Sequence, residues 1–301
     1  MMMTAEMNDD YDAFEAMFNR GAFLRKLREM EAQDEAERAA NAEEDSNNVD
    51  SDTLDYEAVY LQGQRYYDDY KHVNYKFIDF GNANAIKEAD KENSSQQPQP
   101  EESTMRVKIE QDRAYGKGGL VWDAGFILAE HVIHEQEEWK PLVQRDKINS
   151  DNKPIEIVEL GAGTGVTGLM VAAAMQEEVH VSLTDLPELM PLLKKNLEHN
   201  PTAKASAFPL AWGTDVQGNY DLILGADVVA GIYDPVKLAK TICDLCHENS
   251  LVVISLNSRL QEAIANFEDA MGKLFDCVEH RTPISRNKNP NVSILIATKK
   301  R

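Results

Sequence analysis

From about Thr104 to the end of the chain, apolar and polar residues follow two different periods. Segments that alternate with a period of two are predicted to be strands, and segments with apolar residues every three or four positions are predicted to be helices. The predicted strands cover 105–111, 155–160, 180–186, 220–229, 250–257, 276–283 and 293–300. The predicted helices cover 118–139, 168–176, 189–200, 236–249 and 261–275, and a short run, 205–213, precedes the fourth strand.

The order of these segments predicts the fold class. Strands that alternate with helices form a parallel sheet with helices on both faces. The last two strands are joined by a short, turn-rich segment, 284–292, so we expect them to pair antiparallel at one edge of the sheet. The prediction is an α/β, Rossmann-like, doubly wound sheet of seven strands, mostly parallel, with a C-terminal antiparallel hairpin.

The segments before Thr104 have a different composition. Residues 1–55 contain 16 Asp or Glu against five Lys or Arg, and we expect a largely disordered acidic tail with a short amphipathic helix near Phe14. Residues 56–103 form a second unit, a Tyr-rich segment followed by a polar linker, whose tyrosines suit strand packing better than base stacking in so acidic a chain. The third predicted unit is the α/β domain, residues 104–301.

The net charge narrows the possible partners. Lys and Arg total 31 against 52 Asp and Glu, so the formal net charge is −21. A negative field repels phosphate backbones and attracts cations, which disfavours nucleic acid and favours a basic protein or a cationic small molecule. No apolar run is long enough to span a membrane, and no secretory signal is present, so no membrane association is expected.

Three cysteines cannot form a disulfide framework and are typical of a reducing compartment. Cys243 and Cys246 form one C-x-x-C in the predicted helix 236–249. Because a second ligand pair is absent from the sequence, we expect reduced thiols on a packed helix face and no metal site. The expected location is cytoplasmic, with the nucleus left open.

A glycine-rich loop follows the strand 155–160. Its glycines are Gly161, Gly163, Gly165 and Gly168, and they open a helix at the carboxyl end of a parallel strand, where such folds bind ligands. Dinucleotides and S-adenosylmethionine both use this architecture. Residues 163–168 fit G-x-G-x-x-G, and Asp185 ends the next strand, so the pattern formally allows a dinucleotide and an NAD-dependent oxidoreductase.

Three features favour S-adenosylmethionine instead. Glu159 lies beside the loop, where its carboxylate would attract a sulfonium and repel a pyrophosphate. The C-terminal hairpin differs from the standard dinucleotide-binding fold, and no His or Lys occupies an obvious position for hydride transfer.

Five ordered segments, GGLVWDAGFILAEHV, VELGAGTGVTGL, LTDLPELMPLLKKNLEHN, LAWG and YDLILGADVV, carry a family resemblance. Between about Met105 and Arg301 the chain resembles the seven-β-strand methyltransferases of family 16, the methyltransferase-like protein-lysine methyltransferases. The resemblance implies S-adenosylmethionine as cofactor, and its predicted contacts are Trp122 packing on the cofactor, Gly161, Ala162 and Gly163 around its methionine part, Asp185 on the ribose hydroxyls, Trp212 near the adenine and Ala226 beside the sulfonium.

The predicted acceptor site departs from the family pattern. Family members commonly have Asp-x-x-Tyr or Asp-x-x-Phe after the fourth strand, where the Asp holds the incoming amine and the ring walls its channel. This chain has Asp227 at the first position and Ala230 at the fourth. Tyr233, three residues further on, is the candidate replacement, and Asp227 could instead cap the following helix.

The sequence therefore predicts an S-adenosylmethionine-dependent N-methyltransferase, with Asp227 and Tyr233 as candidate catalytic residues. The first interpretation is methylation of a lysine of a basic or chaperone-like protein by a monomeric enzyme. One alternative is a small-molecule amine or another side chain as acceptor. Another is a protein that binds the cofactor but is inactive and serves in interactions.

Overall fold

The computed structural model describes residues 75–81, 104–143, 153–229, 233–258, 261–287 and 289–300 of the chain. The prediction of a disordered acidic tail, residues 1–55, lies outside the described residues, as does most of the Tyr-rich segment and linker.

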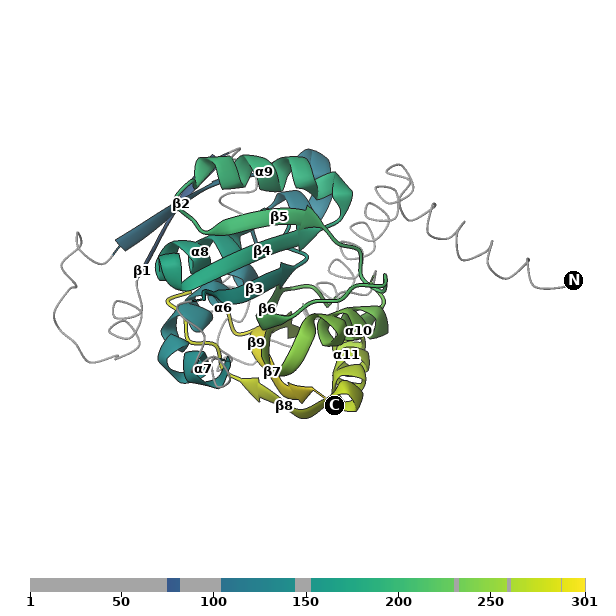
Figure 1. The fold of residues 1–301 in the computed structure, drawn as a ribbon. Coiled ribbons are helices and arrows are strands. Elements are labelled where there is room, and N and C mark those ends of the chain that lie inside the picture. Colours follow the sequence, from purple (N-terminus) through teal and green to yellow (C-terminus); the bar gives the residue numbers. More distant parts are fainter. Residues whose placement is uncertain are drawn as a thin grey trace, which may run out of the picture. The chain divides into compact units, whose positions relative to one another are not determined.

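A seven-stranded sheet forms the centre of the α/β unit (Figure 1). Its strand order is β5-β4-β3-β6-β7-β9-β8. Six strands point the same way, and β9 runs antiparallel to both of its neighbours, β7 and β8. The strand order places β8 at one edge of the sheet. This confirms the predicted fold class and its C-terminal hairpin. The strands are β3 (Ile155–Leu160), β4 (Val179–Asp185), β5 (Ala205–Pro209), β6 (Tyr220–Ala226), β7 (Cys246–Asn257), β8 (Phe275–Arg281) and β9 (Val292–Lys300).

Helices cover both faces of the sheet. One face packs against α6 (Asp123–His134), α8 (Val166–Met175) and α9 (Met190–His199), and the other packs against α10 (Pro235–Leu245) and α11 (Gln261–Leu274). The remaining helical segments are α7 (Gln136–Val143) and the short 3-10 helices η2 (Arg113–Gly119), η3 (Gln176–Glu178) and η4 (Pro187–Leu189). Among the described helices, none combines the length and hydropathy needed to cross a bilayer.

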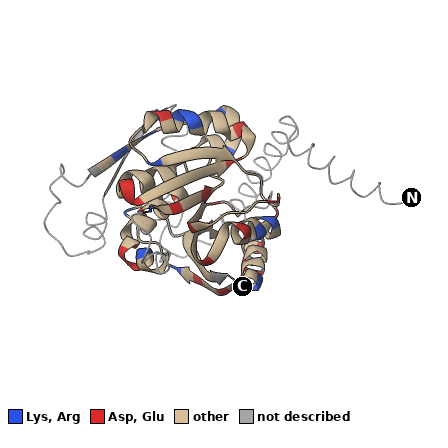
Figure 2. Ribbon diagram, viewed as in Figure 1, with Lys and Arg blue, Asp and Glu red and all other residues tan. Residues whose placement is uncertain are grey.

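The alternation of β3 shows how the sequence divides the core between the two faces. Ile155 and Ile157 belong to the cluster on the α6 and α8 face, whereas Val158 and Leu160 belong to the cluster on the α10 and α11 face. Because side chains alternate along a strand, Glu159 points to the α8 face. In Figure 2 the strands are mostly free of charged residues, which gather on the outer helices.

A second, two-stranded sheet precedes this unit in the chain. Its strands are β1 (Tyr75–Gly81) and β2 (Thr104–Glu110), which pair antiparallel. The predicted strand 105–111 is thus confirmed, but it lies outside the seven-stranded sheet. The seventh strand of the central sheet is β5, which comes from the short run 205–213 that the pattern left without an assignment.

The predicted boundary between the helix 236–249 and the next strand is wrong. The helix ends at Leu245, and Cys246 already belongs to β7, paired with Tyr220. Residues after Cys246 are held by long-range contacts, since the ring of His247 lies 3.2 Å from the carboxylate of Asp221. Cys243 and Cys246 are therefore two buried thiols on different elements and not neighbours on one helix face.

The predicted helix 118–139 is also shorter than expected. Trp122 has extended backbone angles and caps α6, and the glycine-containing segment before it forms η2, where Gly116 has a φ of 63°. A cap at Glu135 separates α6 from α7. These breaks let η2 turn back toward the glycine loop.

Candidate functional site

The glycine loop between β3 and α8 is a tight turn with left-handed backbone. Gly161, Gly163 and Gly165 have φ values of 61°, 54° and 77°. A Cβ atom at Gly163 would lie 2.8 Å from the carbonyl oxygen of Gly118, and one at Gly161 would lie 2.9 Å from a methyl group of Val228. Both the backbone angles and the packing therefore require glycine at these positions.

Asp185 ends β4 beside this loop. Its Oδ2 accepts a hydrogen bond from the N–H of Gly163 and its Oδ1 accepts one from the N–H of Leu186, both at 2.7 Å. The neighbouring N–H of Ala162 donates to the carbonyl oxygen of Thr184 at 2.9 Å. Burial raises the pKa of Asp185 to about 6, and the charge of Glu188 adds to the shift. Each carboxylate oxygen has room for a second hydrogen bond, so the group can still accept two hydroxyl donors of a ligand.

Glu159 lies behind the loop, facing α8. It is 2% exposed, and its Oε2 accepts a hydrogen bond from the N–H of Gly168 at 2.8 Å. Gly168 is the third residue of α8, so the carboxylate satisfies one of the free N–H groups at the helix N-terminus. Burial raises the pKa of Glu159 to about 8, and the charge of Asp185 adds to this shift. The hydrogen bonds from Gly168 and Thr167 lower the pKa but do not cancel the effect of burial.

Two aromatic side chains meet next to Gly161. The rings of Trp212 and Tyr233 are 5.0 Å apart between centroids and cross edge to face at 72°. A Cβ atom at Gly161 would lie 3.2 Å from the six-membered ring of Trp212. Burial raises the pKa of the Tyr233 hydroxyl, and the charges of Asp185 and Asp227 raise it further. Tyr233 thus lies in the field of both carboxylates.

Asp227 follows β6 and has an unusual backbone conformation. Its φ is 53°, which places a residue other than glycine in the left-handed region. Its N–H donates to the carbonyl oxygen of Ser255 at 3.0 Å, next to the pairing of Ala226 with Ser255. Ala226 lies at the carboxyl end of β6 and approaches Gly125 of α6. Ala230 lies outside the described residues.

Trp122 holds the segment that covers the loop. Its indole Nε1–H donates to the carbonyl oxygen of Lys117 in η2 at 3.0 Å. The next residue, Gly118, lies against Gly163 of the glycine loop. The hydrogen bond between Trp122 and Lys117 therefore holds η2 next to the loop. Trp122 is only partly buried, so a ligand can still reach this residue.

Comparisons with known proteins identify the family. The profile described as Lysine methyltransferase matches residues 101–274. The chain belongs to this family. It is 30% identical to the protein-lysine N-methyltransferase EFM6 of Saccharomyces cerevisiae, over 54% of this chain and 73% of that protein. It is 32% identical to the protein N-lysine methyltransferase METTL21A of Mus musculus, over 56% and 74%, and 29% identical to the EEF1A lysine methyltransferase 3 of Xenopus tropicalis, over 65% and 81%.

The family membership confirms the predicted enzyme class, a lysine methyltransferase, and with it the prediction of protein-lysine methylation. Dinucleotide oxidoreduction is thereby excluded as the activity of this domain.

In this lysine methyltransferase most of the predicted site residues lie at the carboxyl ends of the parallel strands. Glu159 differs, because its side chain points toward α8. The glycine loop, Asp185, Trp212, Asp227 and Tyr233 lie around one region, whereas Glu159 turns to α8. The sequence reasoning missed Gly118, which covers the loop, and Asn196 of α9, which binds it from the other side. The signal for Asn196 was present, because it is a polar residue on the apolar stripe of a predicted helix.

Proposed function

We propose that this lysine methyltransferase binds S-adenosylmethionine at the glycine loop and methylates a lysine of a protein with a basic surface. Three features of the residues fit the cofactor. Asp185 offers two acceptor oxygens to a vicinal diol, Trp212 and Tyr233 form an aromatic pair beside Gly161, and the negative charge of Asp185 beside the loop suits a cation. The cofactor supplies a methyl group that is already activated by its bond to a positively charged sulfur.

The chain then has to align the lysine amine and exclude water. A lysine must lose its proton to attack, because its ordinary pKa is about 10.4. Removal from water lowers the pKa of an amine, and a nearby cation lowers it further. In this proposal Asp227 accepts a hydrogen bond from the amine N–H and so directs the nitrogen lone pair.

The observation that carries the proposal is the common environment of Asp185, Asp227 and Tyr233. The Tyr233 ring packs on Trp212 beside Gly161, and the charges of Asp185 and Asp227 both add to burial in raising the pKa of its hydroxyl, so the candidate cofactor residue and the candidate acceptor residue act on the same side chain. The left-handed backbone of Asp227 supports the assignment, since such strain persists mainly where a side chain must point to a defined place. In this proposal Tyr233 supplies the aromatic ring that is missing at position 230, where this chain has Ala and family members commonly have Tyr or Phe.

The partner and location belong to the same proposal. We propose a basic or chaperone-like protein as substrate, and the formal net charge of −21 favours the basic one. We further propose a monomeric enzyme that works in the cytoplasm, with the nucleus as a second candidate location; three cysteines without a disulfide fit a reducing compartment. Fluorescence microscopy of the tagged protein and sedimentation of the purified protein test these two points.

The decisive test is methyl transfer with the purified full chain. Titration calorimetry should show binding of S-adenosylmethionine and no binding of NAD. Cell lysate incubated with radiolabelled methyl donor should show a labelled protein band that yields methyl-lysine on hydrolysis. The matched variant is Asp227→Asn, because Asn also tolerates a left-handed backbone. We expect it to bind the cofactor and to lose labelling by about a hundredfold.

Other outcomes would contradict the proposal in distinguishable ways. Label found only in small molecules would point to a small amine as acceptor. Cofactor binding without any label would indicate a protein that binds S-adenosylmethionine but does not transfer its methyl group. Equal labelling by Asp227→Asn and the unchanged enzyme would remove Asp227 from the acceptor site.

A further inference from the structure

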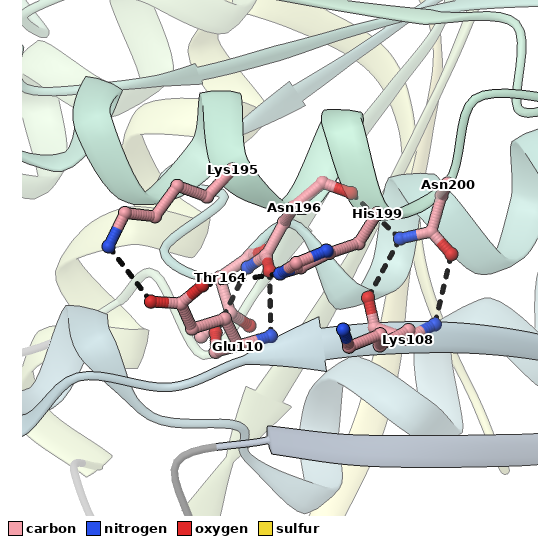
Figure 3. A network of polar contacts seen from close by, with 7 residues as sticks. All are labelled: Lys108, Glu110, Thr164, Lys195, Asn196, His199 and Asn200. Atoms are coloured by element: carbon pink, nitrogen blue, oxygen red, sulfur yellow. Dashed lines mark hydrogen bonds and ion pairs between the residues drawn. The ribbon is translucent and has the colours of Figure 1, made fainter.

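Two buried asparagines connect α9 to β2 (Figure 3). Asn196 accepts a hydrogen bond from the N–H of Glu110 at 2.7 Å and donates to its carbonyl oxygen at 3.0 Å. Asn200 makes the same two contacts with Lys108, at 2.9 and 2.8 Å. Each side-chain amide therefore pairs with one residue of β2 as a neighbouring strand would.

The spacing of the two elements explains why two asparagines suffice. Four residues of a helix rise about 6 Å, and two residues of a strand span nearly 7 Å, so Asn196 and Asn200 face alternate residues of β2. Alternate residues of a strand point their N–H and C=O groups to the same edge. The opposite edge of β2 pairs with β1. Glu110 adds an ion pair with Lys195 at 2.9 Å and a hydrogen bond with the ring of His199 at 3.2 Å, and both contacts hold the same strand to α9.

Asn196 also reaches the glycine loop. Its Nδ2 donates a second hydrogen bond, 2.8 Å long, to the carbonyl oxygen of Thr164. Asn196 is 0% exposed, and Thr164, between Gly163 and Gly165, is also buried. Among the described residues Asn200 makes no hydrogen bond to the loop: besides its two bonds to Lys108, its Nδ2 donates to the carbonyl oxygen of Asn196 at 2.7 Å.

The loop is consequently held from two sides. Asp185, at the end of β4, accepts the N–H of Gly163, and Asn196 of α9 donates to the carbonyl oxygen of Thr164. The same face of α9 packs on the loop through Leu193, whose methyl group would lie 3.0 Å from a Cβ atom at Gly165. The orientation of the peptide group between Thr164 and Gly165 therefore depends on α9 and, through Asn196, on β2.

We propose that Asn196 is a positioning residue for the methyl donor, which couples β2 to the glycine loop. This inference rests on the proposed binding of S-adenosylmethionine at that loop. Loss of the Asn196 amide frees the Thr164 peptide to reorient, and the loop then has to be ordered by the ligand. The affinity for the donor falls, while the rate of transfer from the filled site is retained.

Asn196→Ala and Asn200→Ala are a matched pair of variants. Each deletes three hydrogen bonds, two of them to the backbone of β2, and they differ in the third. Calorimetry on the full chain should show S-adenosylmethionine binding weakened about tenfold by Asn196→Ala and less than about twofold by Asn200→Ala. In the transfer assay Asn196→Ala should raise the KM for the donor with kcat within about twofold of the unchanged enzyme.

Equal affinities of the two variants would overturn the inference, since a merely structural role predicts the same effect for both. A fall in kcat at saturating donor with an unchanged KM would also overturn it. Absence of S-adenosylmethionine binding by the unchanged protein would instead defeat the proposed function. Thermal melting verifies that the variants fold, and if Asn196→Ala does not, Asn196→Ser and Asn200→Ser replace the pair with the same expected ordering.

Discussion

The buried carboxyl group of Glu159 makes a quantitative prediction about stability and pH. Its pKa is raised from 4.5 to about 8, chiefly by burial. Because the folded pKa lies above the unfolded one, the favourable contribution of protonated Glu159 is full below about pH 4.5 and is lost as the pH rises toward 8. Glu159→Gln keeps an acceptor for the N–H of Gly168 and cannot ionise, so it removes this loss.

The expected size follows from the two pKa values. Between pH 5 and pH 7.5 Glu159 stays protonated in the folded protein but ionises in the unfolded chain. This difference lowers the free energy of unfolding by about 3 kcal/mol over that pH range. Glu159→Gln should therefore gain about 3 kcal/mol in free energy of unfolding over the unchanged protein on going from pH 5 to pH 7.5. Urea unfolding at the two pH values measures this difference.

Glu156→Gln is the control for this measurement. It removes a carboxylate from the same strand, but this side chain is 43% exposed and, within the described part of the chain, pairs with His180. Its effect should stay within about 0.5 kcal/mol at both pH values. If the stability gain of Glu159→Gln did not change between pH 5 and pH 7.5, Glu159 would be ionised in the folded protein, and the account of it as a buried, protonated support of α8 would be wrong.

Three further predictions concern the cofactor, the acceptor channel and the hairpin. Asp185→Asn should weaken binding of S-adenosylmethionine at least about tenfold by calorimetry, because the charged acceptor of the ribose hydroxyls is lost, and unchanged affinity would contradict its role. Tyr233→Phe should keep kcat within about threefold and Tyr233→Ala should lower it more than about tenfold, because only the ring packs on Trp212; equal kcat values would refute a wall function. Arg286→Ala should cost about 3 kcal/mol in urea unfolding, since it removes the guanidinium whose Nε–H and Nη2–H both donate to Oε1 of Glu130, a residue 1% exposed, whereas Glu130→Leu with Arg286→Met should cost less.

Local patterns were sufficient for the elements that carry the cofactor loop. The strand 155–160 alternates with a period of two, the helix after it is a continuous apolar run that opens at the glycine loop, and glycine at 161, 163 and 165 has a local cause, the left-handed turn. The antiparallel hairpin was likewise predictable, because the segment that joins its strands is short. Where a feature depends on backbone angles and spacing within about ten residues, its sequence pattern is readable.

Features that depend on distant partners were not predictable in this way. Residues 246–249 have helical spacing in the sequence, but pairing of Cys246 with Tyr220 and contact of His247 with Asp221 extend the strand instead. The hydrogen bond from Gly168 to Glu159 was not predictable for a related reason, and the role of Glu159 in cofactor binding stays a prediction. Proximity in sequence to the loop suggested contact with a ligand, whereas strand alternation, together with the position of α8, turns the carboxylate away from it.

Tyr233 and Asn196 show what a sequence motif can and cannot predict in this chain. Tyr233 was predicted only as a replacement for a missing ring, and its packing on Trp212 gives that replacement a physical basis. Asn196 has no motif, because its role comes from matching a helix to a strand that lies 86 residues earlier in the chain. A polar residue on the buried face of a helix must find partners nearby, since an unpaired buried amide is costly. Because the buried amide of Asn196 needs hydrogen-bond partners, it holds the backbone of Glu110 in β2 and of Thr164 in the glycine loop in place. These contacts depend on the packing of distant segments, so no local sequence motif marks them.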